Sequence, residues 1–148
     1  MKRFLMLLPV LSVSFLACGT PRPTDAAFPS QIGSFTRKDQ PSPVENNGLY
    51  ATYVSPGGIS VTYTVLRFRS PDEARAGLQK ERQEAATGAK VSQQSESKFI
   101  VVYPNRASMV GLVEGSTVVL VATSGQATDD VIGEFVKNLP KAAYGTRN

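Results

Sequence analysis

The sequence contains no histidine, no tryptophan and a single cysteine, Cys18. Because histidine is the commonest general base and metal ligand, its absence excludes a Ser–His–Asp triad and most zinc sites. A lone cysteine cannot form a disulfide within its own chain. These absences exclude most familiar catalytic chemistries, and nothing in the composition implies a metal ion or another cofactor.

Motifs for phosphate or calcium binding are also missing. No glycine-rich segment has the Gly-x-Gly-x-x-Gly or Walker spacing, and the glycines at residues 57–58 have the character of a hairpin turn. A serine–lysine dyad needs a buried lysine, whereas the candidate lysines fall in predicted loops, strand ends or outer helical faces. We therefore predict a protein that is not an enzyme. Two acidic pairs open predicted helices, where capping explains them without a metal, at Asp72–Glu73 and Asp129–Asp130.

The chain begins with an apolar run that is short for a membrane span. Lys2 and Arg3 precede an uncharged segment, residues 4–16, which is followed by Ala17 and Cys18. A transmembrane helix needs about 20 apolar residues. A charged start, a short apolar run and a small-residue cleavage site form the pattern of a secretory signal peptide, which we predict over residues 1–17.

The end of this run resembles the lipobox of bacterial lipoproteins, with Phe15, Leu16, Ala17 and Cys18 in the matching positions. The resemblance implies that Cys18 becomes the N-terminal residue and carries a lipid anchor with fatty acyl chains such as palmitate. Each buried CH2 contributes about 0.8 kcal/mol, so two or three chains anchor a protein durably. In that family Gly19, in place of aspartate, implies the outer membrane or outer surface. A plain secretory signal that leaves a free thiol is the alternative.

The positive charge of the chain belongs partly to the signal peptide. Lys2 and Arg3 carry two of the four net positive charges, which leaves +2 on the mature protein. This charge predicts no nucleic-acid partner. The expected partners are the membrane, through acylated Cys18, and another envelope protein or an anionic glycan.

The mature chain is long enough for one domain with a hydrophobic core. We predict a lipidated, proline-containing tether over residues 18–27, a single domain over residues 28–140 and a C-terminal tail over residues 141–148. At the start of the domain, three apolar side chains are expected to cover the core. They are Phe28, Ile32 and Phe35.

Alternating apolar residues predict a β-hairpin from Leu49 to about Phe68, with its turn at residues 55–58. A continuous apolar run at residues 118–122 predicts a central strand that is covered on both faces. Residues 37–47 are expected to form a loop, and residues 90–97 show no clear pattern. A meander of three strands is predicted over residues 99–103, 108–113 and 117–123.

Two helices are predicted. Ser70 has the position of an N-cap before Pro71, which starts a helix that ends near Ala86. The second helix starts after the predicted cap Thr128 and is stopped by Pro140. The expected fold class is α+β, with a mostly antiparallel sheet of about five strands and both helices packed on one face. Such a layout resembles small bacterial envelope lipoproteins of unassigned function.

Aromatic and basic side chains of the hairpin form the candidate binding site. They are suited to contact anionic lipid heads or glycan phosphates. Packing within the sheet and a solvated strand end are the alternative interpretations. The candidate residues are Tyr50, Tyr53, Tyr63, Arg67 and Arg69.

Two functions follow from these predictions. The first is a membrane-anchored, non-catalytic interaction module that contacts another envelope component through an exposed sheet face. The second is a carrier of a small apolar ligand in a pocket between sheet and helices. A flat face with exposed tyrosines and arginines favours the module, whereas a pocket of several hundred cubic ångströms favours the carrier.

Overall fold

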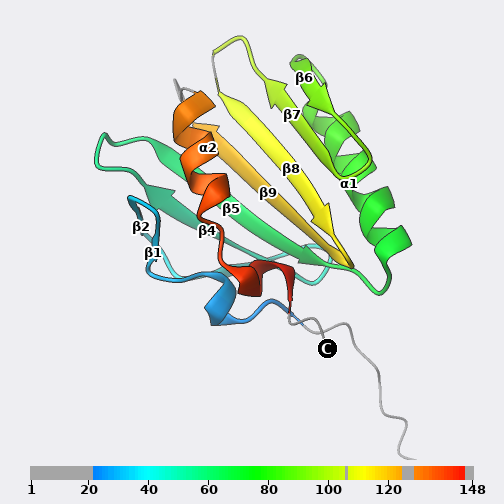
Figure 1. Cartoon of the computed structure of the whole chain (residues 1–148), viewed down its shortest axis with the longest axis horizontal. Helices are drawn as coiled ribbons and strands as arrows, with labels where there is room; N and C mark the ends of the chain where they lie inside the picture. The colour runs from blue at the N-terminus through cyan, green and yellow to red at the C-terminus, as the bar shows by residue number, and fades with distance from the viewer. Residues whose placement is uncertain (1–21, 106, 125–128, 146–148) are drawn as a thin grey trace, which may run out of the picture.

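A computed structural model describes residues 22–105, 107–124 and 129–145 (Figure 1). Within these residues the backbone forms an antiparallel sheet and two α-helices, so the predicted α+β class is confirmed. The sheet has nine strands, and the prediction of about five is wrong. The strands are β1 (Gln31–Ile32), β2 (Phe35–Arg37), β3 (Ser42–Val44), β4 (Gly48–Val54), β5 (Ser60–Arg67), β6 (Lys90–Gln94), β7 (Lys98–Val102), β8 (Ser108–Glu114) and β9 (Thr117–Ser124). The helices are α1 (Pro71–Ala85), α2 (Asp129–Lys137) and the short 3-10 helices η1 (Asp25–Ala27) and η2 (Lys141–Tyr144).

The predicted hairpin and meander are both present, and they join into a single sheet. The strand order is β1-β2-β4-β5-β9-β8-β7-β6, and β3 pairs with β4 beside β2. Strand β5 is antiparallel to β9 over its whole length, from Ser60 opposite Ser124 to Arg67 opposite Thr117. Strand β9 therefore lies inside the sheet, as its continuous apolar run predicts.

The additional strands lie toward the edges of the sheet. Strands β1, β2 and β3 have only two or three residues each, which is too short for an alternating pattern. Strand β6 is mostly exposed and pairs only with β7, with a register shift between Val91 and Gln93. An edge strand is hydrogen-bonded to a neighbouring strand on one side only, and it tolerates polar residues. Its sequence therefore does not distinguish it from a loop.

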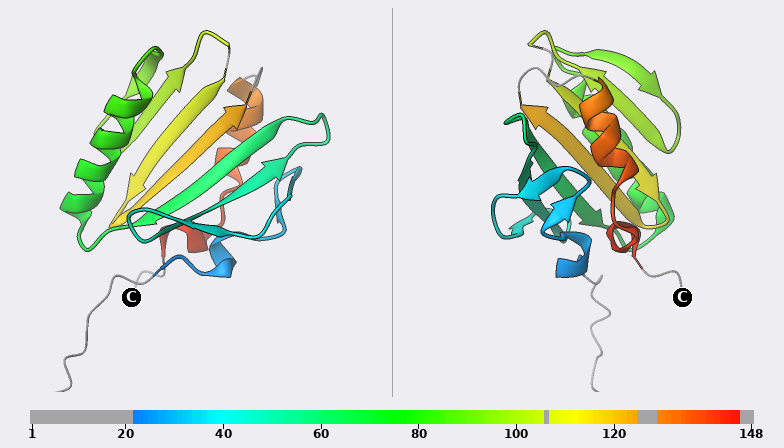
Figure 2. Two further views of the ribbon diagram at one scale, coloured as in Figure 1. Left: turned by 180° about the vertical axis from the view of Figure 1, so that it is seen from behind. Right: turned by 60° about the vertical axis from the view of Figure 1, so that its left-hand side comes forward.

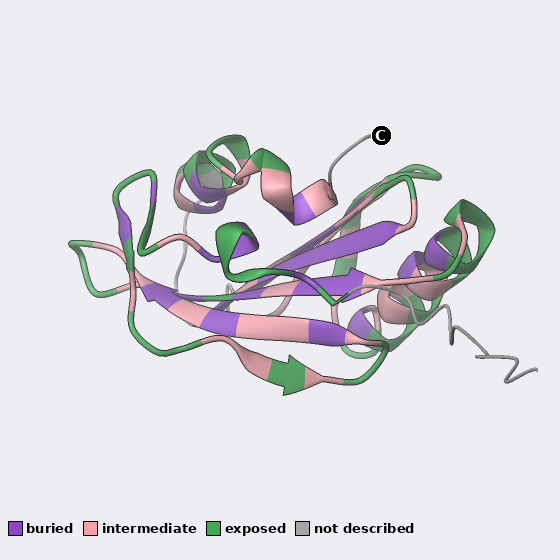
Figure 3. Ribbon diagram, turned by 90° about the horizontal axis from the view of Figure 1, so that it is seen from below, coloured by how far each residue is buried: buried purple, intermediate pink, exposed green. Residues whose placement is uncertain are grey.

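The two α-helices lie on opposite faces of the sheet, so the prediction of both on one face is wrong. Helix α2 is in front of the sheet in Figure 1, and α1 is in front of it in the view from behind (Figure 2, left). Strand β9 serves both faces because successive side chains point to opposite sides. Val118 and Leu120 pack with α1, whereas Val119 and Val121 belong to the core under α2. Figure 3 shows the buried and partly exposed residues along the strands.

The core under α2 is built around aromatic rings. Phe135 of α2 lies 5.1 Å from Phe35, 5.4 Å from Tyr53 and 5.7 Å from Tyr63, measured between ring centroids. Phe28 lies 4.9 Å from Tyr63. Phe28 and Phe35 are buried together with Ile32, so the prediction that these three residues cover the core is confirmed.

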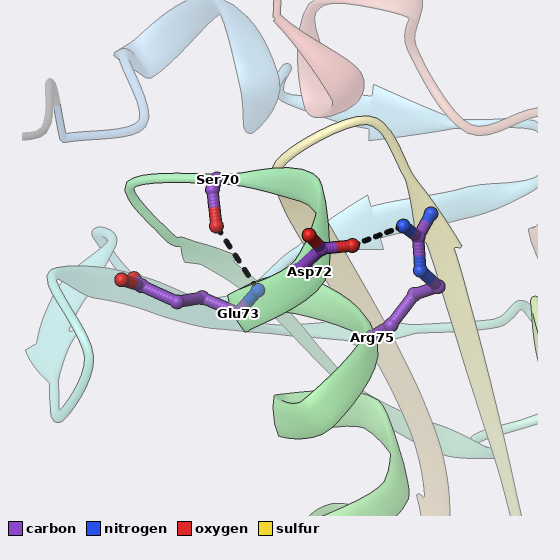
Figure 4. Close-up of polar contacts among 4 residues, drawn as sticks. All are labelled: Ser70, Asp72, Glu73 and Arg75. Carbon is purple, nitrogen blue, oxygen red and sulfur yellow. Dashed lines mark hydrogen bonds and ion pairs between the residues drawn. The ribbon is translucent and has the colours of Figure 1, made fainter.

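Helix α1 begins at the predicted cap. The Ser70 hydroxyl accepts a hydrogen bond of 3.1 Å from the Glu73 backbone N–H, as drawn in Figure 4. The Glu73 carboxylate accepts a hydrogen bond from the Arg69 backbone N–H. Asp72 pairs with Arg75 one turn along the helix. The predicted cap of α2, Thr128, lies outside the described residues.

The C-terminal segment that was expected to be a tail starts with the 3-10 helix η2. Ala143 of η2 is completely buried, and η2 contacts both η1 and β9. The first and last described segments therefore lie at the same end of the molecule (Figure 1). In the described ranges, no helix is long and apolar enough to cross a membrane.

Candidate functional site

The predicted binding residues do not form one surface. Tyr50 is partly exposed on one face of the sheet, whereas Tyr53 and Tyr63 point to the other face and are completely buried. Arg67 is half-buried on the same face as Tyr63, and Arg69 is exposed beyond the end of β5. Residues 50 and 53 are separated by an odd number of positions, so a strand directs them to opposite sides. The prediction of a shared tyrosine face is wrong for this reason.

Tyr53 and Tyr63 are core residues with buried hydroxyl groups. The Tyr53 hydroxyl donates a hydrogen bond of 2.8 Å to the Pro29 carbonyl, and burial raises its pKa to about 12. Burial also raises the pKa of Tyr63 far above its usual value. No hydrogen-bond partner for the Tyr63 hydroxyl is found among the described residues. Both side chains therefore stabilise the fold in the neutral form.

The buried tyrosines predict a loss of stability at alkaline pH. An unfolded tyrosine loses its proton near pH 10, whereas Tyr53 holds it to about pH 12. Stability from the neutral hydroxyl is therefore complete below pH 10 and is lost as the pH rises through 12. We expect the free energy of unfolding to fall across this range, and denaturant titrations at several pH values measure it. Tyr53→Phe should show a shallower fall, and an unchanged slope would contradict this assignment.

Arg67 connects the end of β5 to the C-terminal segment. Its guanidinium donates one hydrogen bond to the Thr117 hydroxyl and another, of 3.1 Å, to the Ala142 carbonyl. The Thr117 hydroxyl in turn donates to the Tyr144 carbonyl at 3.4 Å. Burial lowers the pKa of Arg67, and the neighbouring Tyr63 opposes this shift. These bonds hold η2 against the end of the sheet where β5 ends and β9 begins.

A hollow of about 880 Å³ lies beside η2. It is at the end of the sheet, near the β8–β9 turn, and not between the sheet and the α-helices as predicted for a carrier. Its described walls combine apolar side chains, two glycines and one charge of each sign. The lining residues are Glu114, Gly115, Leu139, Lys141, Ala142, Tyr144 and Gly145.

The hollow is lined by one basic and one acidic side chain among the described residues. Lys141 and Glu114 lie on its walls, and burial together with the Glu114 charge raises the pKa of Tyr144. Gly145 adopts a left-handed backbone with φ of 85°, and a Cβ placed on it would lie 3.0 Å from the Arg67 Nη1 atom. The Arg67 guanidinium is therefore directly behind this wall. Sequence reasoning missed the hollow because most of its lining lies in the segment predicted as a tail.

A second surface is the face of β4 and β5 that carries Tyr50. Tyr50 lies opposite Thr64, and Thr52 lies opposite Thr62. Thr62 is exposed and the other three residues are partly exposed. Helix α1 contacts β7, β8 and β9 on this side of the sheet. This face is polar and carries one aromatic ring, that of Tyr50, among three threonines.

Two further kinds of site concern metal ions and the predicted lipid anchor. In residues 22–105, 107–124 and 129–145, no three acidic or other metal-binding side chains come together. Cys18 lies outside the described residues, so its lipidation stays a prediction from the lipobox.

The fold and the hollow together define an α+β protein with a ligand-sized depression at one end of its sheet. No protein-family model matches the chain, and no curated protein sequence matches it. The extracellular domain of PknH from Mycobacterium tuberculosis is a similar solved structure, with 16% sequence identity and a TM-score of 0.49. The match covers 65% of this chain and 63% of that domain, so it spans less than two thirds of either. This likeness carries no argument about function.

Proposed function

We propose that this protein is a non-catalytic bacterial envelope lipoprotein that carries a small, largely apolar ligand in the hollow beside η2. The hollow is the observation that supports the proposal. Its volume of about 880 Å³ falls within the range of about 300–1,000 Å³ for small-ligand sites. Leu139, Ala142 and the Tyr144 ring supply the apolar part of its walls.

The position of the hollow fits a protein anchored through acylated Cys18. Cys18 precedes η1 by seven residues, and a chain of that length spans at most about 25 Å. Because η1 contacts η2, the proposed anchor keeps the hollow near the membrane surface. A ligand that partitions into the bilayer then has a short path to its site.

Two polar groups near the hollow, Arg67 and Tyr63, are engaged within the fold. Arg67 is engaged with Thr117 and the Ala142 carbonyl. Tyr63 is enclosed in the aromatic core. A general acid or base must reach a substrate atom, and neither group lies on the lining of the hollow. The walls combine apolar surface with the side chains of Glu114, Lys141 and Tyr144.

Filling the hollow should weaken ligand binding. The test uses the complete mature chain with Cys18→Ser, and the neutral fluorescent probe N-phenyl-1-naphthylamine as ligand. We expect saturable binding of one probe molecule. Ala142→Trp should weaken this binding by at least about tenfold, because the indole occupies the space of the ligand.

The matched control is Ala76→Trp, which adds the same ring at an exposed position of α1. This variant should bind the probe like the parent chain. Circular dichroism melting curves establish that both variants are folded. Equal binding by the parent and Ala142→Trp, or no binding by the parent, would refute the carrier function.

The interaction module is the second candidate function, and the partly exposed face with Tyr50, Thr52, Thr62 and Thr64 supports it. Its residues form two neighbouring cross-strand pairs on β4 and β5. A photo-crosslinker at position 62 of the lipidated protein, compared with one at position 76 on α1, tests this surface in cells. A specific envelope partner at position 62, together with absent probe binding, would favour the module over the carrier.

A further inference from the structure

Two cationic side chains stand at the hollow. Lys141 is exposed on its wall. Arg67 lies behind the wall, with Nη2 3.1 Å from the Ala142 carbonyl oxygen and Nη1 3.0 Å from the position of a Cβ on Gly145. Since Ala142 and Gly145 both line the hollow, the guanidinium is separated from the ligand space by a single layer of backbone.

Arg67 has no acidic counter-ion in the described part of the chain. Neither of the ion pairs found there includes it. Burying a cation without a counter-charge is costly. A guanidinium has five N–H donors, and Thr117 and Ala142 account for two of them. An oxyanion held nearby would supply both charge and acceptors.

Gly145 places no side chain against the guanidinium. A side chain at this position would start 3.0 Å from Nη1 and would cover the cation. The positive φ of 85° also disfavours other residues there. The backbone thus brings the smallest residue next to Arg67.

Glu114 opposes the two cations. It lines the same hollow, and its negative charge contributes to the raised pKa of Tyr144. Among the described residues, one acid and two bases are found at or beside the hollow. The opposing signs allow a test, because removal of Glu114 and removal of Lys141 should change the affinity for an anion in opposite directions.

Resting on the proposed carrier function, we propose that the ligand is an anionic amphiphile with one hydrocarbon chain and a carboxylate or phosphate head. The head lies on the side of Lys141 and Arg67, and the chain lies along Leu139 and the Tyr144 ring. Charge complementarity selects the head, and the apolar walls accept the chain.

The test compares ligands that share a chain and differ in the head. The measurement is displacement of N-phenyl-1-naphthylamine from the mature Cys18→Ser chain by palmitate, hexadecyl phosphate or hexadecanol. Each ligand is used below the concentration at which it forms micelles or precipitates. We expect at least one anion to bind about tenfold more tightly than hexadecanol. The order of the two anions tells a carboxylate head from a phosphate head.

Charge variants locate the head. Lys141→Gln and Arg67→Gln should each weaken binding of the preferred anion several-fold, while Glu114→Gln should strengthen it. In Lys141→Gln and Glu114→Gln, hexadecanol affinity should change much less than anion affinity, because hexadecanol carries no charge. Because Arg67→Gln also removes bonds to η2, its hexadecanol affinity shows whether the hollow is intact.

The outcomes separate this inference from the proposed function. Equal affinity for the anions and hexadecanol, with both blocked by Ala142→Trp, would refute the anionic head and leave the carrier function standing. Anion affinity that does not respond to Lys141 or Glu114 would refute the placement of the head. Absence of binding by all three ligands and by the probe would refute the carrier function itself.

Discussion

Phe135→Ala should lower the free energy of unfolding by about 3–5 kcal/mol, because it removes a large ring from the middle of a core. Phe135 is completely buried, and its ring contacts Phe35, Tyr53 and Tyr63. Alanine leaves a cavity among rings whose strands are held in register by the sheet. Urea denaturation of the mature Cys18→Ser chain, followed by circular dichroism, measures the loss.

Val136→Ala is the control for Phe135→Ala. Val136 is the next residue of α2 and is only partly buried, so its truncation should cost much less. A loss below about 1 kcal/mol for Phe135→Ala would mean that α2 is not part of the aromatic core. Such a result would contradict the described face of the sheet.

Gly111→Val should destabilise the opposite core by about 2–3 kcal/mol through overpacking. Gly111 lies in β8 directly opposite Phe99 of β7. A Cβ at this position would lie 2.2 Å from the Phe99 ring, which is only 1% exposed and belongs to the core with α1. The ring has little room to move away, so the backbone must shift.

Gly133→Ala provides the matched glycine control. Gly133 lies on the exposed side of α2, and a Cβ there has no neighbour within 4 Å among the described residues. Alanine should therefore stabilise the protein by up to about 1 kcal/mol through helix propensity. Thermal melting monitored by circular dichroism compares the two variants. A neutral result for Gly111→Val would show that the Phe99 ring does not need this space.

The elements that the sequence predicts well are those that local interactions define. Ser70 and Pro71 mark the start of α1 because a cap depends on residues within one turn. The turn at residues 55–58 joins strands whose alternation is visible over several residues. The strand boundaries of the hairpin and meander follow for the same reason.

The candidate site was predicted less well, for two different reasons. The opposite orientation of Tyr50 and Tyr53 follows from the two-residue period of a strand, so that signal was available in the sequence. The contact of Arg67 with Ala142 joins residues that are 75 positions apart. Only the folded chain brings them together, and the hollow beside η2 depends on that contact.

By itself, the sequence determined the α+β class, the hairpin, the meander and the start of α1. These features depend on side-chain alternation and capping between near neighbours. The tertiary structure decided that β5 pairs with β9, that the helices cover opposite faces and that residues 141–145 complete a hollow. The apolar run of β9 is compatible with a helix on either face. The choice was made by packing between distant segments, which no local pattern encodes.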